Sequence, residues 1–358
     1  MTRIRPFRKD DIAAVVELRG ERFGRSEQDG PGALAAYLAE IFFGNPWYDD
    51  ALPSLVAEEG PGGRIVGFLG VVPRRMRVSD RLLRLATTTQ FMVARTAPPL
   101  VGAQLIRTLF EGGQDLALAD VASSPARRLW ESLGGVIAPT ASLNWVRVLR
   151  PLQHLLSRVA RRRRLGRVAG ACAAPFEAAA GRLVPACARP RPPAIGRCEP
   201  MDDADVAACI ATPLDARLLR GEHDAASLGW LLDMLRRKRS HGVLQARRVV
   251  DTRGGLLGWY LYQASIGGGA HVVHVDARPR ATGTVLDHLL RETWRQGCTA
   301  VTGRFDARLL GALAERHGLI YGGDTWVLMH ARDPEVVAAV ARDDSALTRL
   351  DGEWWMAF

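Results

Sequence analysis

The hydrophobic pattern of the first 150 residues changes several times between a helical and a strand period. Ile12, Val15, Val16 and Phe23 fall on one face of a helix, whereas short apolar runs bounded by turn residues indicate strands. The pattern predicts, in order, strand 4–7, helices 12–23 and 31–43, strands 54–59, 64–72 and 82–94, helix 101–110, strand 115–121, a helix from residue 124 and strand 142–149. Three consecutive strands followed by strand–helix–strand connections predict an α/β fold, a mixed sheet flanked by helices.

The same order of features occurs a second time in the chain. Residues 198–208 repeat the pattern of residues 4–14, a short strand, a proline, an acidic helix start and an apolar face. Gly67 and Gly258 lie in similar apolar strands, and two later pairs of glycines, 113 with 134 and 297 with 318, are each 21 residues apart. A repeat at this period indicates two domains of one fold. We expect two copies of one fold, residues 1–150 and 197–358, joined by a linker, residues 151–196.

The positive charge of the chain is concentrated in one segment. The 358 residues carry a net charge of +10, yet residues 147–197 hold twelve arginines, including Arg161 to Arg164, and one acid, Glu177. The linker is therefore expected to be basic, with a short amphipathic helix, a second helix and an extended tether. Three roles remain open for it: docking on an anionic membrane surface, contact with a phosphate-rich partner such as tRNA, or covering the junction between the copies.

Cysteine spacing and the absence of long apolar runs limit the class of protein. Five cysteines lie far apart with no CxxC pair, which argues against a zinc site and a disulfide framework and predicts a reducing compartment and no metal. The charged N-terminus resembles no signal peptide, and no run of about 18 apolar residues predicts a spanning helix. We expect a cytoplasmic protein, with peripheral membrane contact through the linker left open.

The helix that starts near Ser124 contains the most specific motif. Ser124 is expected to cap this helix, Pro125 to occupy its first helical position and Gly134 to end it. The motif reads Ser123-x-x-Ala126-x-x-Leu129-Trp130-x-x-x-Gly134-Gly135. With the order of elements, it resembles the GNAT (GCN5-related N-acetyltransferase) superfamily, which often shows Asn-x-x-Ala-x-x-Leu-Tyr-x-x-x-Gly-Phe there. The resemblance implies two GNAT-like domains in tandem and an acyl-CoA-dependent N-acyltransferase. The expected donor is acetyl-CoA or another acyl-CoA, and the expected acceptor is a small-molecule or sugar-linked primary amine.

The resemblance also implies where the acyl-CoA binds. In the family, one strand pairs its backbone with the pantetheine, and the following loop directs N–H groups at the pyrophosphate from a helix N-terminus. The first copy keeps only the last glycine of that loop, which also contains two prolines without N–H donors. The second copy keeps the arginine and the first glycine. The implied cofactor-binding residues are Met92, Val93, Arg95, Gly102, Ala103, Ser123, Arg280 and Gly283.

Catalytic residues are harder to assign from the sequence. Amine acylation needs a base for the ammonium and often an acid for the thiolate. Trp130 and Ala314 occupy the positions of the family's tyrosine, so neither copy keeps that acid. Glu58, Asp120 and His274 are the candidate bases, although each residue type at such a position is commonly structural.

Two other functions remain open. Fem-type aminoacyltransferases resemble two GNAT folds in tandem and use aminoacyl-tRNA, which a basic segment suits. A non-catalytic, GNAT-derived binding or scaffold protein would explain the missing tyrosine and the incomplete loops. Separately, the aromatic residues near the C-terminus, Trp354 and Trp355 among them, are expected to pack against the second copy or across the domain interface.

Overall fold

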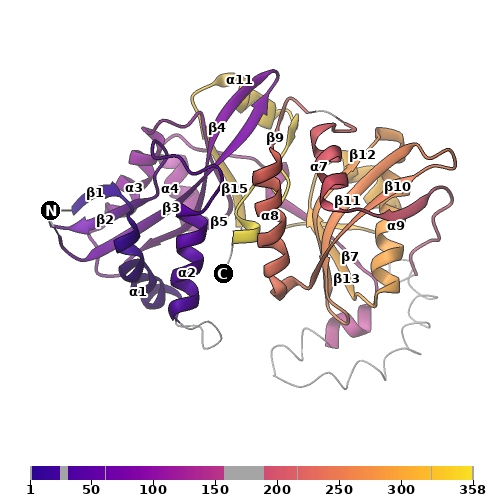
Figure 1. The fold of residues 1–358 in the computed structure, drawn as a ribbon, viewed down its shortest axis with the longest axis horizontal. Coiled ribbons are helices and arrows are strands. Elements are labelled where there is room, and N and C mark those ends of the chain that lie inside the picture. Colours follow the sequence, from indigo (N-terminus) through magenta and orange to yellow (C-terminus); the bar gives the residue numbers. More distant parts are fainter. Residues whose placement is uncertain are drawn as a thin grey trace.

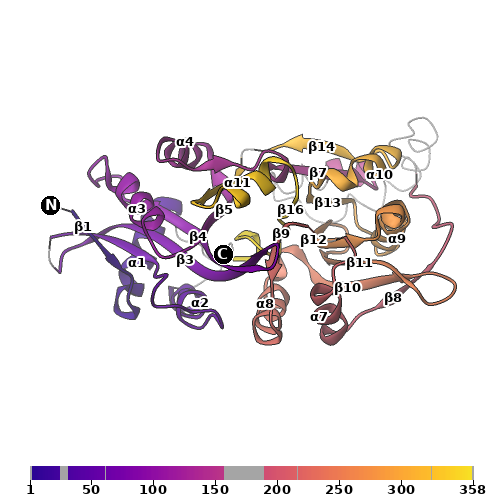
Figure 2. The same cartoon turned by 90° about the horizontal axis from the view of Figure 1, so that it is seen from above.

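The computed structural model describes residues 2–24, 31–60, 62–156, 189–215, 217–323 and 325–356. These residues form two mixed sheets that lie side by side, with helices on both faces (Figure 1). Seen from above, α1, α2, α8 and α7 line one side of the molecule and α4, α11 and α10 line the other (Figure 2). The predicted mixed α/β architecture is confirmed.

The first copy supplies most of the first sheet. Its elements are β1 (Thr2–Pro6), α1 (Ile12–Phe23), α2 (Pro31–Phe43), β2 (Leu55–Glu59), β3 (Ile65–Val78), β4 (Arg81–Val93), α3 (Val101–Phe110), β5 (Leu116–Ser123), α4 (Ser124–Ser132), β6 (Val136–Ile137) and β7 (Leu143–Val148). These follow the predicted order, and β3 is six residues longer at its end than the apolar run indicated.

The second copy repeats this order with three additional elements, β9 between its first two helices and α11 and β16 at its end. Its elements are β8 (Arg197–Pro200), α7 (Asp203–Ala211), β9 (Leu219–Glu222), α8 (Ala225–Arg237), β10 (Val243–Val250), β11 (Leu256–Ala264), β12 (Gly269–Ala277), α9 (Thr282–Arg295), β13 (Ala300–Arg304), α10 (Leu310–Glu315), β14 (Leu319–Gly322), β15 (Thr325–Ala331), α11 (Pro334–Ala341) and β16 (Ser345–Ala346). The last element is followed by residues 347–356, which we call the C-terminal segment.

Each sheet contains strands of both copies, and β9 and β16 of the second copy join the first sheet beside β3. The first sheet has the order β1-β2-β3-β4-β5-β15-β6, and the second has the order β14-β7-β13-β12-β11-β10-β8. Strand β7, expected to close the first copy, therefore lies between β13 and β14 of the second, and β15 lies between β5 and β6 of the first. The prediction that residues 142–149 complete the first sheet was wrong, because β7 forms its backbone hydrogen bonds with β13 and β14 of the second copy.

The glycines that revealed the repeat have a packing role. A Cβ atom at Gly67 would lie 3.0 Å from side-chain atoms of both Val101 and Leu105, and one at Gly258 would lie 2.6 Å from Val285. Helix α3 packs against β3 in the first copy, and α9 packs against β11 in the second. Each helix can approach its strand this closely only because glycine has no side chain at the contact. The shared glycine therefore marks the same helix–sheet contact twice.

One hydrophobic core extends across both copies. Phe68, Leu105 and Trp130 of the first copy belong to the same buried cluster as Leu231 and Trp259 of the second. Trp355 of the C-terminal segment also lies in this cluster, with its side chain 1% exposed. The expectation that the aromatic C-terminal residues pack across the interface is confirmed. An interface built as a core resembles that of an obligate dimer.

Some local predictions need correction. Phe23 is 64% exposed, so it does not belong to the buried face of α1, which Val15 and Leu18 form. The capping residue of α4 is Ser123 rather than Ser124, because its side chain accepts from the Ala126 N–H. Residues 151–156 are helical as expected. Residues 157–188, with Arg161 to Arg164 and Glu177, lie outside the described residues.

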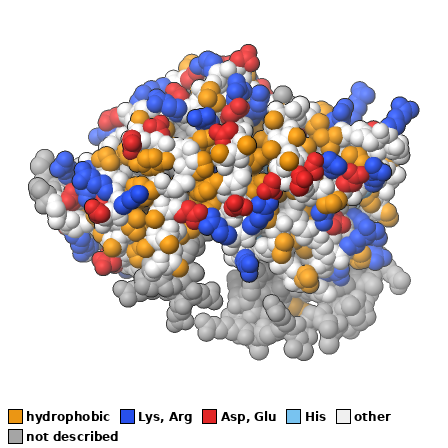
Figure 3. Space-filling view, in the orientation of Figure 1, with side chains coloured by type: hydrophobic (Ala, Val, Ile, Leu, Met, Phe, Trp, Pro, Cys, Tyr) orange, Lys and Arg blue, Asp and Glu red, His pale blue; other side chains and the backbone are white. Residues whose placement is uncertain are grey.

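The surface in the described part shows no concentration of one charge on the face drawn in Figure 3, where basic and acidic side chains are interspersed. Among the described helices, none combines the length and apolar character needed to cross a bilayer.

Candidate functional site

Each sheet contains two parallel neighbouring strands that diverge part of the way along. Strands β4 and β5 pair over residues 85–87 and 116–118, and strands β12 and β13 pair over residues 269–271 and 300–302. Each diverging strand also has a β-bulge against its outer neighbour, β3 or β11. Divergence leaves one backbone edge of each strand without its usual partner, and a ligand with amide groups can pair with such an edge.

The C-terminal segment fills the divergence of the first copy. The Glu353 carboxylate accepts from the Val121 N–H at 3.3 Å and also bonds the Thr89 side chain. The Glu353 N–H donates to Asp120 Oδ1 at 2.6 Å. Burial and the nearby Asp120 carboxylate raise the pKa of Glu353 to about 8. Residues 352–353 therefore occupy the space between β4 and β5 from the side of α1 and α2, where Tyr37 of α2 bonds the Met356 carbonyl.

Side chains also narrow the other side of this divergence. Phe91 lies four residues beyond Thr87, the last paired residue of β4. An ideal Cβ at Gly102, in the first turn of α3, would lie 3.3 Å from the Phe91 ring, 3.5 Å from Leu129 and 3.6 Å from Val93. The start of α3 is therefore packed against the side chains of the strand that the family uses for pantetheine.

In the second copy the divergence opens into a cavity. A cavity of about 250 Å³ is lined by β12 residues 272–275 and 277, by the start of α9 and by residues 304–309. A smaller cavity of about 60 Å³ lies beside it, lined by residues of α7, β9 and the C-terminal segment. Asp215, His274, Val275, Arg308 and Thr348 line both cavities. We call the two cavities together the cleft.

Helix α9 begins at one end of the cleft. Pro279 and Thr282 line the larger cavity there, and Gly283 follows in the first helical turn. The guanidinium of Arg316 lies 2.8 Å from an ideal Cβ at Gly283, held by two hydrogen bonds of 2.8 Å to Asp287. Arg280 is exposed, and within the described ranges no hydrogen bond or ion pair holds its guanidinium. A helix N-terminus with two nearby guanidinium groups favours a phosphate.

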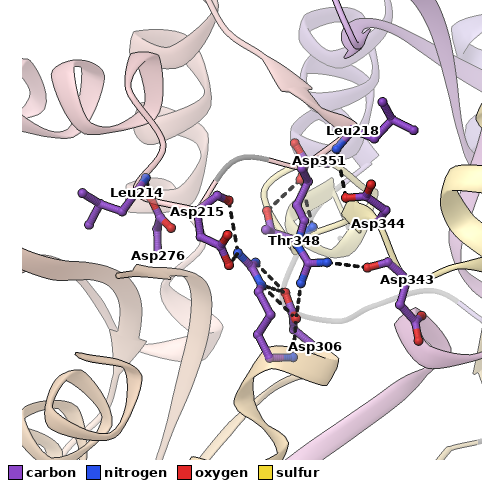
Figure 4. A network of polar contacts seen from close by, with 11 residues as sticks. Leu214, Asp215, Leu218, Asp276, Asp306, Asp343, Asp344, Thr348 and Asp351 are labelled. Atoms are coloured by element: carbon purple, nitrogen blue, oxygen red, sulfur yellow. Dashed lines mark hydrogen bonds and ion pairs between the residues drawn. The ribbon is translucent and has the colours of Figure 1, made fainter. Parts of the chain in front are cut away.

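A network of paired charges forms the wall between the two cavities. Arg308 contacts Asp306 at 2.6 Å and Asp215 at 3.0 Å, and Arg217 contacts Asp306 at 3.3 Å. Figure 4 shows Asp215, Asp306 and Asp343 around these guanidinium groups. The loop before β9 is thereby tied to the segment that follows β13. It is also tied to residues 343–344, since the Leu218 N–H donates to Asp344.

His274 lies where the two cavities meet. Its ring stacks on Trp259, with 4.6 Å between the ring centroids and 26° between the planes. Its Nδ1 atom is buried and, among the described residues, has no hydrogen-bond partner. Burial lowers the pKa of His274, and the carboxylates of Asp276 and Asp351 oppose that shift. A neutral imidazole with an unused nitrogen beside a cleft has the form that a general base requires.

The structure does not bring the three candidate bases together. Glu58 lies at the far edge of the first sheet, where Arg5 binds its carboxylate at 2.8 Å and lowers its pKa. Asp120 lies on β5 with a fully buried side chain, ion-paired to Arg304 at 2.7 Å. Of the three, His274 lines the cleft, whereas Glu58 lines a separate polar hollow together with Arg5 and Asp11. A catalytic role for Glu58, Asp120 or His274 stays a prediction.

The predicted cofactor residues divide between the copies. Met92 is buried and Val93 partly buried on β4, whereas Arg95 is exposed beyond the strand. Gly102 and Ala103 lie in the first turn of α3, and Ser123 caps α4. Arg280 and Gly283 lie at the start of α9, beside the larger cavity. Their roles in binding stay predictions.

Sequence reasoning missed several residues of the site. Arg304 and the C-terminal residues Arg349 and Glu353 lie between the copies, and no local motif marks them. For Arg349 and Glu353, charge beside the apolar and aromatic residues of the C-terminal stretch was the available signal. The family's tyrosine is replaced as expected, and Trp130 packs edge-on against Phe110 at 5.0 Å between the ring centroids.

Two sheets, each with a bulged strand that diverges from its parallel neighbour, define a chain with the GNAT fold in two copies. A GCN5-related N-acetyltransferase from Kribbella flavida is similar over 95% of this chain and 73% of its own, with a TM-score of 0.56 and 14% identity. A conserved protein from Enterococcus faecalis, described as a probable N-acyltransferase, is similar over 92% of this chain and 73% of its own, with a TM-score of 0.57 and 9% identity. Saccharomyces cerevisiae N-myristoyltransferase with bound myristoyl-CoA is similar over 92% of this chain and 77% of its own, with a TM-score of 0.50 and 10% identity. No protein-family model and no curated protein sequence matches the chain.

Proposed function

We propose that this protein is an acyl-CoA-dependent N-acyltransferase whose second copy binds the acyl-CoA. The observation that carries the proposal is the difference between the two divergent strand pairs. In the first copy the C-terminal segment and Phe91 fill the space, whereas in the second copy the corresponding space is a cleft that starts at α9. The solved structures with this fold include acyltransferases, which supports the reaction class.

The lining residues of the cleft suit three parts of the donor, namely the pyrophosphate, the pantetheine and the thioester. The N-terminus of α9, with Arg280 and Arg316 near it, would bind the pyrophosphate. The unpaired edge of β12 beyond His271 would form hydrogen bonds with the pantetheine amides, as an added strand does. The thioester would then lie near His274, where the larger cavity, which starts at α9, meets the smaller cavity beside α7.

His274 would act as the general base. The neutral imidazole accepts a proton from the attacking ammonium, the amine nitrogen bonds to the thioester carbon, and the carbon–sulfur bond breaks. Neither cavity has a tyrosine among the lining residues that the structure describes. The imidazolium formed in the first step can return its proton to the departing thiolate, and the second proton lost by the amine nitrogen passes to water, so the overall reaction releases one proton.

A matched pair of substitutions tests which copy binds the donor. Val275 lies four residues beyond the last paired residue of β12, as Phe91 does in β4. Val275→Phe is expected to fill the cleft and weaken acetyl-CoA binding at least tenfold by calorimetry. Phe91→Ala enlarges the space between β4 and β5 in the first copy and is expected to leave the affinity for acetyl-CoA unchanged. Unchanged binding in Val275→Phe, or a loss in Phe91→Ala, would contradict the assignment.

Acetyl transfer to a primary amine is the simplest form of the proposed reaction. The wild-type protein is expected to bind acetyl-CoA in calorimetry and to release free CoA when amines are supplied. Absence of CoA binding together with salt-sensitive tRNA binding would favour an aminoacyl-tRNA donor instead. Absence of both would favour a binding or scaffold protein.

A further inference from the structure

Arg349 is a buried cation in the wall of the cleft. The residue is 7% exposed and lines the larger cavity. Nη1 donates to the Val272 carbonyl at 3.3 Å, and Nη2 donates to Asn144 Oδ1 at 3.2 Å. The guanidinium also lies over the Trp354 ring, 4.8 Å from its centroid. Across the described ranges no carboxylate lies within ion-pair distance of Arg349.

Three other arginines of the cleft have acidic partners. Arg304 pairs with Asp120, and Arg308 and Arg217 share Asp306. Arg349 therefore adds an uncompensated positive charge to this wall. Burial lowers the pKa of Arg349 to about 10, so the side chain still carries its charge at neutral pH. A buried charge without a counter-ion is unfavourable, and an anionic ligand would remove that cost.

The position of Arg349 indicates which part of a ligand it meets. Val272, whose carbonyl binds Arg349, is the first residue of β12 beyond the paired stretch, so Arg349 lies at the closed end of the divergence. Helix α9 begins at the other end of the cleft. A donor whose phosphates lie at α9 would direct its acyl end, and the acceptor that attacks it, toward Arg349.

A carboxylate is the anion that suits this position. A guanidinium has five N–H donors, and two of them already bond neutral acceptors, which leaves donors for a planar two-oxygen group. Such charge-assisted bonds are short and strong where water is excluded. We propose that the closed end of the cleft is a carboxylate-binding subsite with Arg349 as its cation, so that one substrate of the acyl transfer carries a carboxylate.

This inference rests on the proposed function, because the cleft is taken as the site of acyl transfer. The carboxylate has two possible sources. It can belong to a dicarboxylic acyl group on CoA, or to an amino acid that serves as the amine acceptor. The subsite itself makes the same contact in both cases.

The first experiment needs no CoA. Thermal unfolding of the full chain is measured with succinate and with the neutral isostere succinamide at equal ionic strength. Succinate is expected to raise the Tm of the wild type and of Arg253→Gln, an exposed hairpin substitution that removes the same charge. It is expected to leave the Tm of Arg349→Gln unchanged, and succinamide is expected to have no effect. An equal response to succinamide, or a retained succinate response in Arg349→Gln, would overturn the subsite.

Arg349 also holds the C-terminal segment, so the glutamine variant can lose structure. Arg349→Lys keeps the charge but not the planar donor pair, and is expected to keep a weaker succinate response. If Arg349→Gln does not fold, this variant and the comparison of succinate with succinamide in the wild type decide the question. A response in Arg349→Lys to both compounds, or to neither, would contradict the subsite.

The second experiment separates the two sources. In one arm, succinyl-CoA is compared with butyryl-CoA for binding; in the other, glycine is compared with methylamine as acceptor for acetyl-CoA. At least a tenfold preference for the carboxylate compound is expected in one arm, and it should disappear in Arg349→Gln. Thioester binding without any such preference would refute the subsite alone. Succinate discrimination without any thioester binding would refute the acyltransferase proposal and leave the subsite standing.

Discussion

Asp120 and Arg304 form an ion pair across the boundary between the two copies, 2.7 Å apart, with side chains 0% and 10% exposed. Each lies two residues beyond the last paired residue of its strand, Leu118 of β5 or Thr302 of β13. The two positions are therefore equivalent in the repeat, and they carry opposite charges that meet at the boundary between the copies. Like charges at this place would repel in a medium of low polarity. The two copies must therefore differ in sequence at this equivalent position for the pair to form.

Removing one partner of this pair is expected to be costly. Asp120→Leu leaves the Arg304 guanidinium buried with its counter-ion gone, and about 3–5 kcal/mol of the free energy of unfolding should be lost. Asp120→Leu combined with Arg304→Met removes both charges and should cost less than either single change. Urea unfolding of the three variants measures this coupling. Losses that simply add would show that the two charges do not depend on each other.

Glu353 gives the protein a predictable dependence on pH. Its pKa of about 8 in the folded protein exceeds the ordinary value of about 4.3, so the folded state binds more protons between these values. Stability then falls as the pH rises from about 4 to 8. Glu353→Gln should remove this loss and stabilise the protein by about 1–3 kcal/mol at pH 8.

Glu58→Gln provides a control of opposite sign. Arg5 lowers the pKa of Glu58, so its contribution to stability is present above the ordinary pKa and is lost as the pH falls. The glutamine variant is expected to be less stable than the wild type at neutral pH. Thermal unfolding between pH 5 and 8 compares the two variants, and a Glu353→Gln protein with the wild-type pH slope would contradict the assignment.

The proposed base makes acyl transfer depend on pH in the acidic range. Burial lowers the pKa of His274 below its ordinary value of about 6.5, so the imidazole is neutral at pH 7 and gains a proton only as the pH falls. We expect kcat/KM to fall on an acidic limb below pH 6.5. His274→Asn should lower turnover about 10²–10⁴-fold and abolish that limb. His317→Asn, at an exposed position beyond α10, should retain both the rate and the limb.

The sequence was sufficient for the elements and the repeat, and this success has a physical basis. Period, capping and terminating glycines are local properties, so α4 and its cap could be placed within one residue. Gly67 and Gly258 were informative because a helix needs the space of the missing Cβ in each copy. The exchange of β7 and β15 was not predictable, because a strand pattern does not specify which of two similar sheet edges it will pair with.

The site was predictable only in part, for a similar reason. His274, Arg280 and Gly283 were named because they lie within the strand and loop that the family resemblance implies. Arg349 and Glu353 come from a segment remote in sequence that the fold inserts between the copies. The charge of such residues is visible in the sequence, but their burial and their partners depend on contacts between distant parts of the chain.

The exchanged strands predict how the two copies behave when the chain is cut between them. A protease recognition sequence inserted within residues 157–188 should allow cleavage into two fragments that remain together in size-exclusion chromatography. Strand β7 pairs with β13 and β14, and β15 pairs with β5 and β6, so separating the fragments breaks both sheets and the common core. Either fragment expressed alone lacks a strand inside its sheet and should aggregate, because unpaired edges are exposed on both sides of the gap. Co-expression should restore the complex, and two fragments that separate and stay folded without denaturant would contradict the exchange.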